Sequence, residues 1–493
     1  MMMRFKKEYL LVALIFTIIF SGCKKWNDSQ ALVTPDLGQN LFDAIAANTS
    51  LSKFTSYIQK SGVDVILRSS KAFTVWAPTD AALTSLDPTI VSDSARLRSF
   101  VLNHISNQSY FTRDAQISIR ISMLNGKYHN FFGTTIEDAN ITAADKFVSN
   151  GVLHVIDKSM LVLPNVWDFI NSTTGQYLQN NFIAGLNFQS FDPSIATIDS
   201  ISALTGLPVY HPGTGVVIKN TFNQRVFDLR REDKQYTYFV IADAGFTLKA
   251  DSLKPYFKTT STTTTDSLDR WNIVKDLVVD TLYPTAATIP SILTSRFGIS
   301  VPVNKSLIID TKKLSNGVVY VLSLSDVITA TKLLQTVVQG ENPSGFLSDK
   351  TGNTNYRVRR NLATNQNYTD ILVSGHGVTT YYAYYRLSEM PSAKYNVYAL
   401  AVNDFQSAAL TQTIVVNYLT PPIPPANTPP STTIFTTLAS LAYAVPLSTA
   451  VGAYNEVLLG TFTSTSFGTL EIRLTAVGTT PIVLDYLRLV PIP

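Results

Sequence analysis

Histidine and cysteine are the residues from which a metal site or a nucleophilic centre would be built, and both are sparse in this chain. The 493 residues include one cysteine and five histidines, at positions 104, 129, 154, 211 and 376. Zinc ligands usually come in closely spaced groups, and none is present. The sequence also lacks a Gly-x-Ser-x-Gly nucleophile motif, a phosphate-binding glycine loop, a dinucleotide fingerprint and a calcium-binding run of carboxylates. We therefore expect no metal, no cofactor and no enzymatic activity.

A glycosidase is the enzyme class that is hardest to exclude, because its two carboxylates need only be close in space. The charge run DLRRED at residues 228–233 is a candidate for such a site. It lies directly before a strand-like segment, so we interpret it as a solvated loop or strand edge. A binding protein is therefore favoured over an enzyme.

The single cysteine, Cys23, follows a segment typical of an exported protein. A positively charged start precedes an apolar run over residues 10–20, which is short for a membrane-spanning helix and predicts a signal peptide over residues 1–22. The residues FSGC that end at Cys23 resemble the lipobox of bacterial lipoproteins. This resemblance implies that Cys23 is lipidated and that residues 23–37 form a tether. The alternative is an ordinary secretory signal with a chance cysteine.

The charged residues after the cysteine bear on localisation. Lys24, Lys25 and Asp28 partly resemble the tract that routes lipoproteins to the outer surface in the Bacteroidetes group. The resemblance implies a surface-exposed outer-membrane lipoprotein of the cell envelope, with the membrane as one partner.

Composition and charge indicate a folded, β-rich protein that does not bind nucleic acid. Hydrophobic residues make up 45% of the chain and charged residues only 15%. Thr, Ser, Asn and Tyr supply much of the polarity, which suits exposed sheets and long loops. The formal charge of +4 falls to about +2 when the signal peptide, with three basic residues and one acidic residue, is removed. Such a charge gives no electrostatic basis for binding nucleic acid.

Three sequence landmarks occur twice, in the same order. NLFDAI at 40–45 returns as NVWDFI at 165–170, FTVWAPTDAAL at 73–83 returns as YTYFVIADAGF at 236–246, and SNGVLHVID at 149–157 returns as SNGVVYVLS at 315–323. The offset between the copies grows by about 38 residues after the first landmark and hardly changes afterwards. We therefore predict a duplicated domain whose second copy carries one insertion within residues 184–235.

Each landmark predicts a particular local structure. Asn40 and Asn165 are predicted N-caps of amphipathic helices. Pro78 cannot continue a central strand, and Asp80 is predicted to start the helix that follows it. The Asn-Gly pair in SNGVLHVID predicts a tight turn that leads into a strand.

The apolar strand that runs into APTDAA, followed by NHI at 103–105 and by SNGVLHVID, resembles the fasciclin (FAS1) domain. The resemblance covers residues 38–163, and its motif residues are Pro78, Thr79, Asp80, His104, Asn150, Gly151 and His154. It implies a compact α+β domain, a β-sandwich or wedge with packed helices, that binds proteins or glycans in cell adhesion. Residues 164–340 form a divergent copy, in which Ile241 and Ala242 replace Pro78 and Thr79.

The histidines of the motif are interpreted mainly as structural. The best-known adhesive segments of the family surround a Tyr-His pair, which is Asn103-His104 here, so only His104 is carried over as a candidate. In the second copy we expect Asp280 at its position. His154 alternates with apolar residues on a predicted strand, and its counterpart is Tyr320, which predicts a half-buried structural residue.

Residues 341–493 contain many short strand-like runs and predict an all-β, jelly-roll-like sandwich. The final 40 residues resemble the closing strands of galactose-binding-like modules, many of which bind carbohydrate. In the segment YYAYYR, Tyr382, Tyr384 and Arg386 are predicted on one face of a strand and Tyr381 and Tyr385 on the other. One of the two sets is a candidate stacking platform for sugar rings, and the alternative is that one set fills the core while the other decorates the sheet.

Together these observations predict a lipid-anchored, non-catalytic binding protein of the cell envelope. Its tandem fasciclin-like copies would act as a spacer or adhesive arm. The favoured partner is a polysaccharide, which the protein would help to capture. The alternative is a protein–protein adhesin that acts through the fasciclin-like copies.

Overall fold

The computed structural model describes residues 35–325, 332–361, 364–420, 423, 435–447 and 454–493. It divides into two compact units. The first contains the described residues up to Phe169 with the segments 229–235 and 313–317, and the second contains 170–228, 236–312 and 318–493. Cys23 and the predicted signal peptide lie outside the described residues. Within the described part of the chain, no helix is long and apolar enough to cross a membrane.

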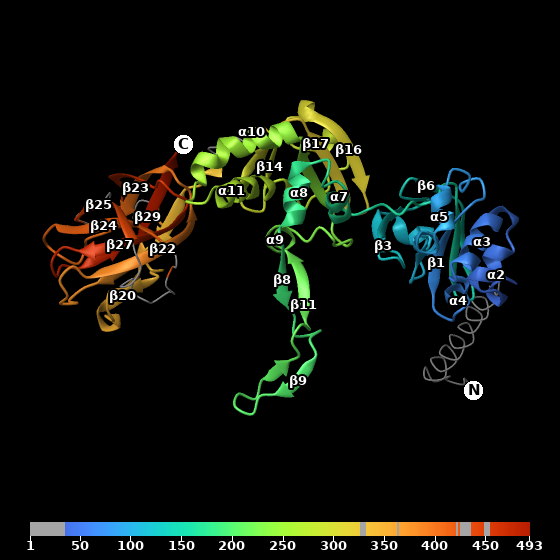
Figure 1. Cartoon of the computed structure of the whole chain (residues 1–493), viewed down its shortest axis with the longest axis horizontal. Coiled ribbons are helices and arrows are strands. Elements are labelled where there is room, and N and C mark those ends of the chain that lie inside the picture. Colours follow the sequence, from blue (N-terminus) through green and yellow to red (C-terminus); the bar gives the residue numbers. More distant parts are fainter. Residues whose placement is uncertain (1–34, 326–331, 362–363, 421–422, 424–434, 448–453) are drawn as a thin grey trace, which may run out of the picture. The chain divides into compact units, whose positions relative to one another are not determined.

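The first copy of the repeat contains a seven-stranded sheet in the order β2-β1-β7-β6-β5-β4-β3 (Figure 1). β1 and β7 are parallel, and the other neighbours are antiparallel. The strands are β1 (Phe73–Pro78), β2 (Ile105–Ser106), β3 (Ile119–Ser122), β4 (Tyr128–Phe132), β5 (Thr135–Ile136), β6 (Ala139–Val148) and β7 (Gly151–Ile156). The helices are α2 (Leu41–Ala46), α3 (Ser52–Lys60), α4 (Asp64–Leu67), α5 (Pro88–Ser92) and α6 (Ser94–Leu102).

Two apolar cores lie on opposite faces of β1 and β7, because successive residues of a strand point to opposite sides. Val75 and Leu153 belong to a core that includes buried residues of α2, α3 and α6. Trp76 and Ile156 belong to a second core, with buried residues of β3, β4 and β5. Every residue of β1 and β7 is therefore buried. The predicted α+β wedge, with helices against one face of the sheet, is confirmed.

The second copy has a four-stranded sheet in the order β13-β12-β17-β16, which corresponds to β2-β1-β7-β6 of the first. Its strands are β12 (Tyr236–Ile241), β13 (Val278–Val279), β16 (Ile308–Leu314) and β17 (Gly317–Leu322), and β14 (Ile292–Thr294) pairs separately with β15 (Ser300–Pro302). Its helices are α7 (Val166–Ser172), α8 (Leu178–Gly185), α9 (Thr221–Arg225), α10 (Asp243–Leu253) and α11 (Thr262–Val274).

The duplication extends to single hydrogen bonds. The Asn150 side chain accepts from the N–H of Leu41 at 2.7 Å and donates to the carbonyls of Leu67 and Ser69. The Asn316 side chain accepts from the N–H of Val166 at 2.8 Å and donates to the carbonyls of Leu229 and Arg231. In each copy the asparagine before the last strand therefore fixes the start of the first helix.

One predicted correspondence is wrong. Ile105 pairs with Val75 in the first copy, and Val278 pairs with Tyr238 in the second. This register places Leu277, and not Asp280, at the position of His104. The short strand after the helix begins three residues earlier than predicted, and the divergent sequence LVVDTLY carries no motif that would reveal the shift.

An arm over residues 187–220 falls within the predicted insertion. It consists of two antiparallel ribbons, in which β8 (Asn187–Phe191) pairs with β11 (Val216–Asn220) and β9 (Ile198–Ile201) pairs with β10 (Pro208–Tyr210). Figure 1 shows the arm projecting from the ends of α8 and α9. The remainder of the second copy keeps the element order of the first.

The C-terminal region is an all-β sandwich, as predicted. One sheet has the order β18-β29-β23-β26, a second has β19-β22-β27-β24-β25, and a third has β20-β21-β28. The strands are β18 (Thr336–Gln339), β19 (Gly345–Phe346), β20 (Thr354–Arg360), β21 (Asn367–Val373), β22 (Tyr382–Met390), β23 (Lys394–Leu400), β24 (Leu410–Leu419), β25 (Phe435–Val445), β26 (Val457–Thr463), β27 (Gly468–Ala476), β28 (Ile482–Leu484) and β29 (Tyr486–Ile492). β18 precedes the predicted start at residue 341 and nevertheless pairs with β29.

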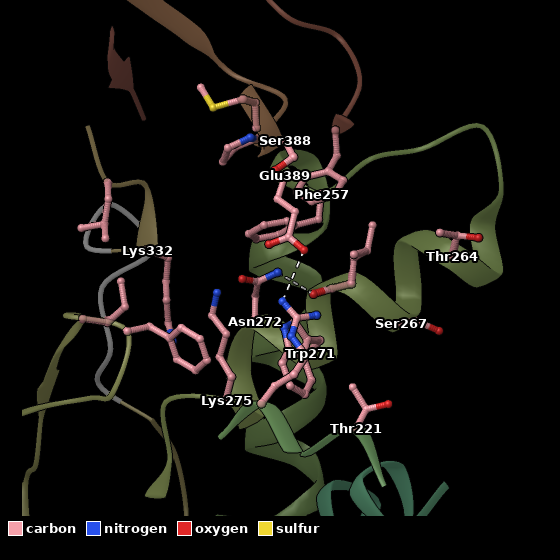
Figure 2. Close-up of a pocket in the computed structure, with 18 of the residues that line it drawn as sticks. Thr221, Phe257, Thr264, Ser267, Trp271, Asn272, Lys275, Lys332, Ser388 and Glu389 are labelled. Atoms are coloured by element: carbon pink, nitrogen blue, oxygen red, sulfur yellow. Dashed lines mark hydrogen bonds and ion pairs between the residues drawn. The ribbon is translucent and has the colours of Figure 1, made fainter. Parts of the chain in front are cut away.

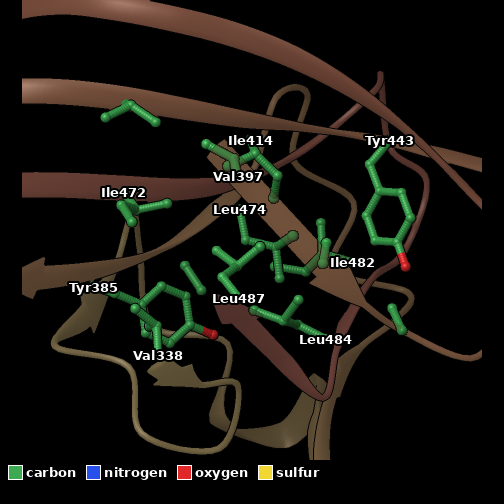
Figure 3. Close-up of a cluster of buried hydrophobic side chains, with 14 of the residues drawn as sticks. Val338, Tyr385, Val397, Ile414, Tyr443, Ile472, Leu474, Ile482, Leu484 and Leu487 are labelled. Carbon is green, nitrogen blue, oxygen red and sulfur yellow. The ribbon is translucent and has the colours of Figure 1, made fainter. Parts of the chain in front are cut away.

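The core of the sandwich is formed by side chains from all three sheets (Figure 3). Val397 and Leu487 come from one sheet, Ile414 and Ile472 from the second, and Leu484 from the third. Tyr385 points into this cluster from β22. Among the described residues of the sandwich, one apolar cluster thus connects the three sheets.

Candidate functional site

Three of the predicted motif residues, Pro78, Thr79 and Asp80, lie at the end of β1 and have structural roles. Pro78 is the last residue of β1 and is buried between its neighbours. The Thr79 hydroxyl accepts from the N–H of Ala82, which caps the turn that follows. Asp80, predicted to start that segment as a helix, instead accepts hydrogen bonds from the hydroxyl of Ser52 and the N–H of Lys53 at the start of α3. The residue is a helix cap, but for a helix that lies earlier in the chain.

His104 is fully buried and makes a hydrogen bond with each ring nitrogen. Nδ1 donates to the carbonyl of Phe100, and Nε2 accepts from the N–H of Met160. Burial lowers its pKa to about 3, although the hydrogen bond to Phe100 acts in the opposite direction. A neutral, buried ring of this kind cannot contact an external partner, so His104 stabilises the fold.

His154 is also fully buried, where a half-buried residue was predicted. Its Nε2 donates to the carbonyl of Tyr110, its Nδ1 accepts from the N–H of Asp145, and its ring stacks on Trp76 with centroids 5.6 Å apart. Burial lowers its pKa. Its counterpart Tyr320 donates to a backbone carbonyl in the same way, which again indicates a structural role.

Asn150 and Gly151 complete the motif. Asn150 makes the three hydrogen bonds described above. Gly151 has a φ of +149°, and a Cβ there would lie 1.9 Å from the carbonyl oxygen of Phe73. Both residues are therefore required by the backbone and are not available to a ligand.

The predicted tyrosine platform does not exist as a free surface. Tyr381, Tyr384 and Tyr385 are all buried. Tyr385 donates to the carbonyl of Gly340 in the core, and Tyr381 stacks on His376 with centroids 4.7 Å apart. The hypothesis failed because both faces of β22 are covered, a fact that alternation along one strand cannot reveal.

The face of β22 that carries Tyr382, Tyr384 and Arg386 is covered by charged side chains. The Arg386 guanidinium lies 4.9 Å from the centre of the Tyr384 ring, and Arg473 lies 4.6 Å from that of Tyr382. Both arginines pair with the buried carboxylate of Glu471. Tyr382 and Arg386 are thus part of a cation–π and ion-pair ladder that stabilises the sheet.

A pocket in the second unit is a better candidate for ligand binding. It has a volume of about 730 Å³, within the range of small-molecule sites. Its walls come from α8, α9, α11 and the end of β22 (Figure 2). Trp271 of α11 is the largest aromatic side chain in the lining, and the polar lining residues include Ser267, Asn272, Lys275 and Glu389.

Glu389 enters the pocket because β22 is irregular at its end. The register of β22 against β27 shifts between Leu387 and Met390, and Glu389 has a φ of +58°. β-Bulges and left-handed non-glycine residues are enriched near functional sites, where they aim a side chain. Here the bulge brings the carboxylate to 3.3 Å from the guanidinium of Arg225.

Arg225 links the carboxylate to the aromatic surface. Its guanidinium lies 4.9 Å from the centre of the Trp271 ring and pairs with Glu389. The two charged side chains are 47% and 66% exposed, and exposed ion pairs contribute little free energy. A ligand that supplies hydroxyl groups can therefore replace this ion pair at low cost.

Cations at the back of the pocket are affected by burial. Lys332 pairs with Asp276 at 2.5 Å between fully buried side chains, and burial lowers the pKa of Lys332. Burial also lowers the pKa of Lys275, partly offset by Asp276. Among the described residues no group of histidine, cysteine and carboxylate side chains has the arrangement of a metal site.

Trp271 and Glu389 could not be recognised as site residues from the sequence. A single tryptophan in an amphipathic helix is usually a core residue, and Glu389 acquires its place only through the bulge. Residues 229–233 of the predicted charge run belong to the first unit, and no residue of the run lines the pocket.

Comparison with known proteins establishes the nature of the first copy. Residues 49–162 match the Fasciclin domain. This fasciclin domain lies within the predicted range of 38–163. The predicted fold class, tandem fasciclin-like copies followed by an all-β sandwich, is confirmed.

Several solved structures are similar to parts of the chain. A FAS1 domain pair from the insect cell adhesion molecule fasciclin I has 15% identity and a TM-score of 0.23, and covers 57% of this chain and 98% of its own. A family 35 carbohydrate binding module from Clostridium thermocellum has 14% identity and a TM-score of 0.20, and covers 32% and 97%. A xylan-binding domain from Paenibacillus barcinonensis has 12% identity and a TM-score of 0.22, and covers 32% and 99%. No curated protein matches the sequence.

Proposed function

We propose that this protein is a non-catalytic binding protein of the cell envelope that holds a carbohydrate in the pocket around Trp271. The observation that carries the proposal is the grouping of an indole, a carboxylate and a guanidinium within one open pocket. Sugar rings present an apolar face and a rim of hydroxyl groups, so they are bound by an aromatic surface beside groups that both donate and accept hydrogen bonds. The pocket around Trp271 provides these groups.

The lipid anchor is the second part of the proposal. Acylation of Cys23 by several chains would hold the protein firmly at a membrane, because two or more chains are needed for stable anchoring. In the intact organism, Cys23→Ala should move the protein from the membrane fraction to the soluble fraction. Retention of the variant in the membrane fraction would contradict lipid anchoring at this residue.

The carbohydrate site is tested by a glycan-array screen of residues 27–493, followed by calorimetry with the best ligand. Trp271→Ala should weaken binding by about fivefold to 150-fold if a sugar ring stacks on the indole as strongly as a nucleic-acid base does, which is about 1–3 kcal/mol. Glu389→Gln keeps the shape of the side chain and should also weaken binding. Tyr356→Ala, at a residue 52% exposed on β20, is the matched control and should leave binding unchanged. Binding that survives both pocket variants would overturn this site.

The alternative is a protein adhesin in which the fasciclin-like copies make the contacts. The match of residues 49–162 to the Fasciclin domain favours it, and the first copy exposes Ile117 and Phe132 at 76% and 53%. A fragment over residues 38–335, which ends before β18, should then bind a defined envelope protein without the sandwich. This alternative would be favoured if the full protein binds no glycan on the array while the fragment binds an envelope protein.

A further inference from the structure

The arm over residues 187–220 is held by side-chain hydrogen bonds at the point where it joins the rest of the second copy. The Asn220 side chain caps α9 by accepting from the N–H groups of Phe222 and Asn223. Its amide donates to the carbonyl of Ile183 and to the side chain of Asn187, and Asn187 and Asn220 are cross-strand partners. The two strands therefore leave the second copy in a defined register.

The arm exposes an unusual amount of apolar surface. Within residues 187–220 only Gly215 and Asn220 are buried. Ten large apolar side chains are between 40% and 94% exposed, and these are Phe188, Phe191, Ile195, Ile198, Ile201, Leu204, Leu207, Val209, Val216 and Ile218. Together they present several hundred Å² of apolar area, the size at which a surface patch marks an interaction site.

The arm also lacks charge where it is most apolar. Residues 200–218 contain no aspartate, glutamate, lysine or arginine. The register β8–β11 places Phe191 opposite Val216 and Gln189 opposite Ile218, so three apolar side chains share one face of that ribbon at its outer end. The tip carries Leu204, the most exposed of these side chains at 94%. A surface of this composition is unfavourable in water and is expected to be covered.

The backbone of the arm also has hydrogen-bonding groups without strand partners. Each ribbon has only two strands among the described residues, so one edge of every strand has unpaired N–H and C=O groups. A two-stranded hairpin is marginally stable in water, and further strands or packing are needed to stabilise it. A lipid bilayer does not meet this need, because open sheet edges are not tolerated in hydrocarbon. Basic residues that would draw the tip to anionic lipids are also absent.

The arm of a second copy of this chain can cover the exposed apolar side chains and can also pair with the free strand edges. It offers exposed apolar side chains of the same composition, free strand edges for hydrogen bonding and, within residues 200–218, no aspartate, glutamate, lysine or arginine that would repel. A two-fold axis would place the same surface on both partners, which is the commonest arrangement of homodimers. Ten large apolar side chains that are at least 40% exposed can supply a contact on the order of the roughly 800 Å² that each partner of a stable complex buries. We propose that the arm is a self-association element that pairs with the arm of a second copy.

The test is the oligomeric state of residues 27–493, measured by sedimentation velocity over a concentration series from about 0.1 to 100 µM, the range in which most specific complexes dissociate. The unaltered chain should form a dimer. The double variant Leu204→Lys, Leu207→Lys should raise the dissociation constant at least tenfold, because it places charges in the contact. Val65→Lys, at a site 71% exposed in the first copy, is the matched control and should leave the dimer unchanged.

A cross-linking experiment locates the contact. Residues 27–493 contain no cysteine, so Ala203→Cys introduces a single thiol beside Leu204, at an exposed position. Oxidation should give a disulfide-linked dimer, whereas Ala287→Cys, at an exposed site outside the arm, should not. A chain that stays monomeric at about 100 µM, or a dimer unaffected by the Leu204 and Leu207 substitutions, would overturn the proposal. Binding of a monomer to phosphatidylcholine vesicles would identify a lipid surface as the partner instead.

Discussion

Asp80 and Asp243, one in each copy of the repeat, cap a helix that lies far from them in the sequence. Asp80 accepts from the N–H of Lys53 at 2.8 Å, across 27 residues, and Asp243 accepts from the N–H of Leu178 at 2.7 Å, across 65 residues. Neither α3 nor α8 has a side-chain cap from its own N-cap residue. The aspartate after the repeated strand therefore joins that strand to an earlier helix, which explains why it is present in both copies.

Replacement of this distant cap should destabilise the first copy. Asp80→Ala removes the acceptor for the N–H of Lys53 and for the hydroxyl of Ser52, and loss of an N-cap costs about 0.5–2 kcal/mol. The midpoint of urea unfolding should fall accordingly. Asp138→Ala, at an exposed position of the same copy, is the control and should change it little. An equal effect of the two substitutions would contradict the capping role.

The sequence predicted the fold well because its landmarks are backbone requirements. Asn150 and Gly151 recur as Asn316 and Gly317, since a turn and a helix start depend on them. The sequence could not show which helix Asp80 caps, because that depends on tertiary packing. It also misplaced the counterpart of His104, because Leu277 preserves no chemical feature of the histidine.

The candidate site was predicted less well, for a physical reason. Alternation along β22 separates Tyr382 and Tyr384 from Tyr381 and Tyr385, but it does not say what covers either face. The pocket depends on a bulge at Glu389 and on a helix from a different part of the chain, which carries Trp271. Neither feature has a sequence signature.

The two equivalent asparagines should be among the most sensitive positions of the repeat. Asn150→Ala leaves a buried N–H without an acceptor and two carbonyls without their donor, and each unsatisfied group costs about 1–3 kcal/mol. We expect a loss of roughly 3 kcal/mol or more in the free energy of unfolding. Asn316→Ala should have the same effect on the second copy. Asn107→Ala, at an exposed position, serves as the control in denaturant unfolding, and a comparable loss there would refute the argument.

His104 should make the first copy less stable in acid. Its folded pKa is about 3, below the unfolded value near 6.5, so the unfolded chain binds a proton more readily. The stabilising contribution is complete above pH 6.5 and is lost as the pH falls toward 3, by up to on the order of 4 kcal/mol. The carbon-bound protons of the His104 ring should show no titration in NMR spectra between pH 7 and 4.

A glutamine at this position separates protonation from packing. The amide of His104→Gln can donate to the carbonyl of Phe100 and accept from the N–H of Met160, as the ring does. The variant should lose part of its stability at pH 7 but should show a weaker decline between pH 6.5 and 4. A decline as steep as that of the unaltered protein would assign the acid sensitivity to other groups.

Asp485 should give the sandwich the opposite dependence on pH. Its side chain is 7% exposed, and burial raises its pKa to about 7, with further contributions from the nearby carboxylates of Asp370 and Glu341. Because the folded pKa lies above the unfolded value of 3.8, the folded chain binds the proton more tightly. Its contribution to stability is complete below pH 3.8 and is lost as the pH rises to about 7.

The substitution Asp485→Asn removes this titration and keeps the shape of the side chain. The variant should be more stable than the unaltered protein at pH 8, by on the order of 2–4 kcal/mol, and the two should converge as the pH approaches 4. Asp251→Asn, at a side chain 64% exposed in the same unit, should follow the unaltered protein at every pH. Thermal unfolding of the three proteins at pH 4, 6 and 8 measures the difference. A constant offset between Asp485→Asn and the unaltered protein would show that the effect comes from packing and not from the proton, because only a titrating group makes the offset grow between pH 4 and 7.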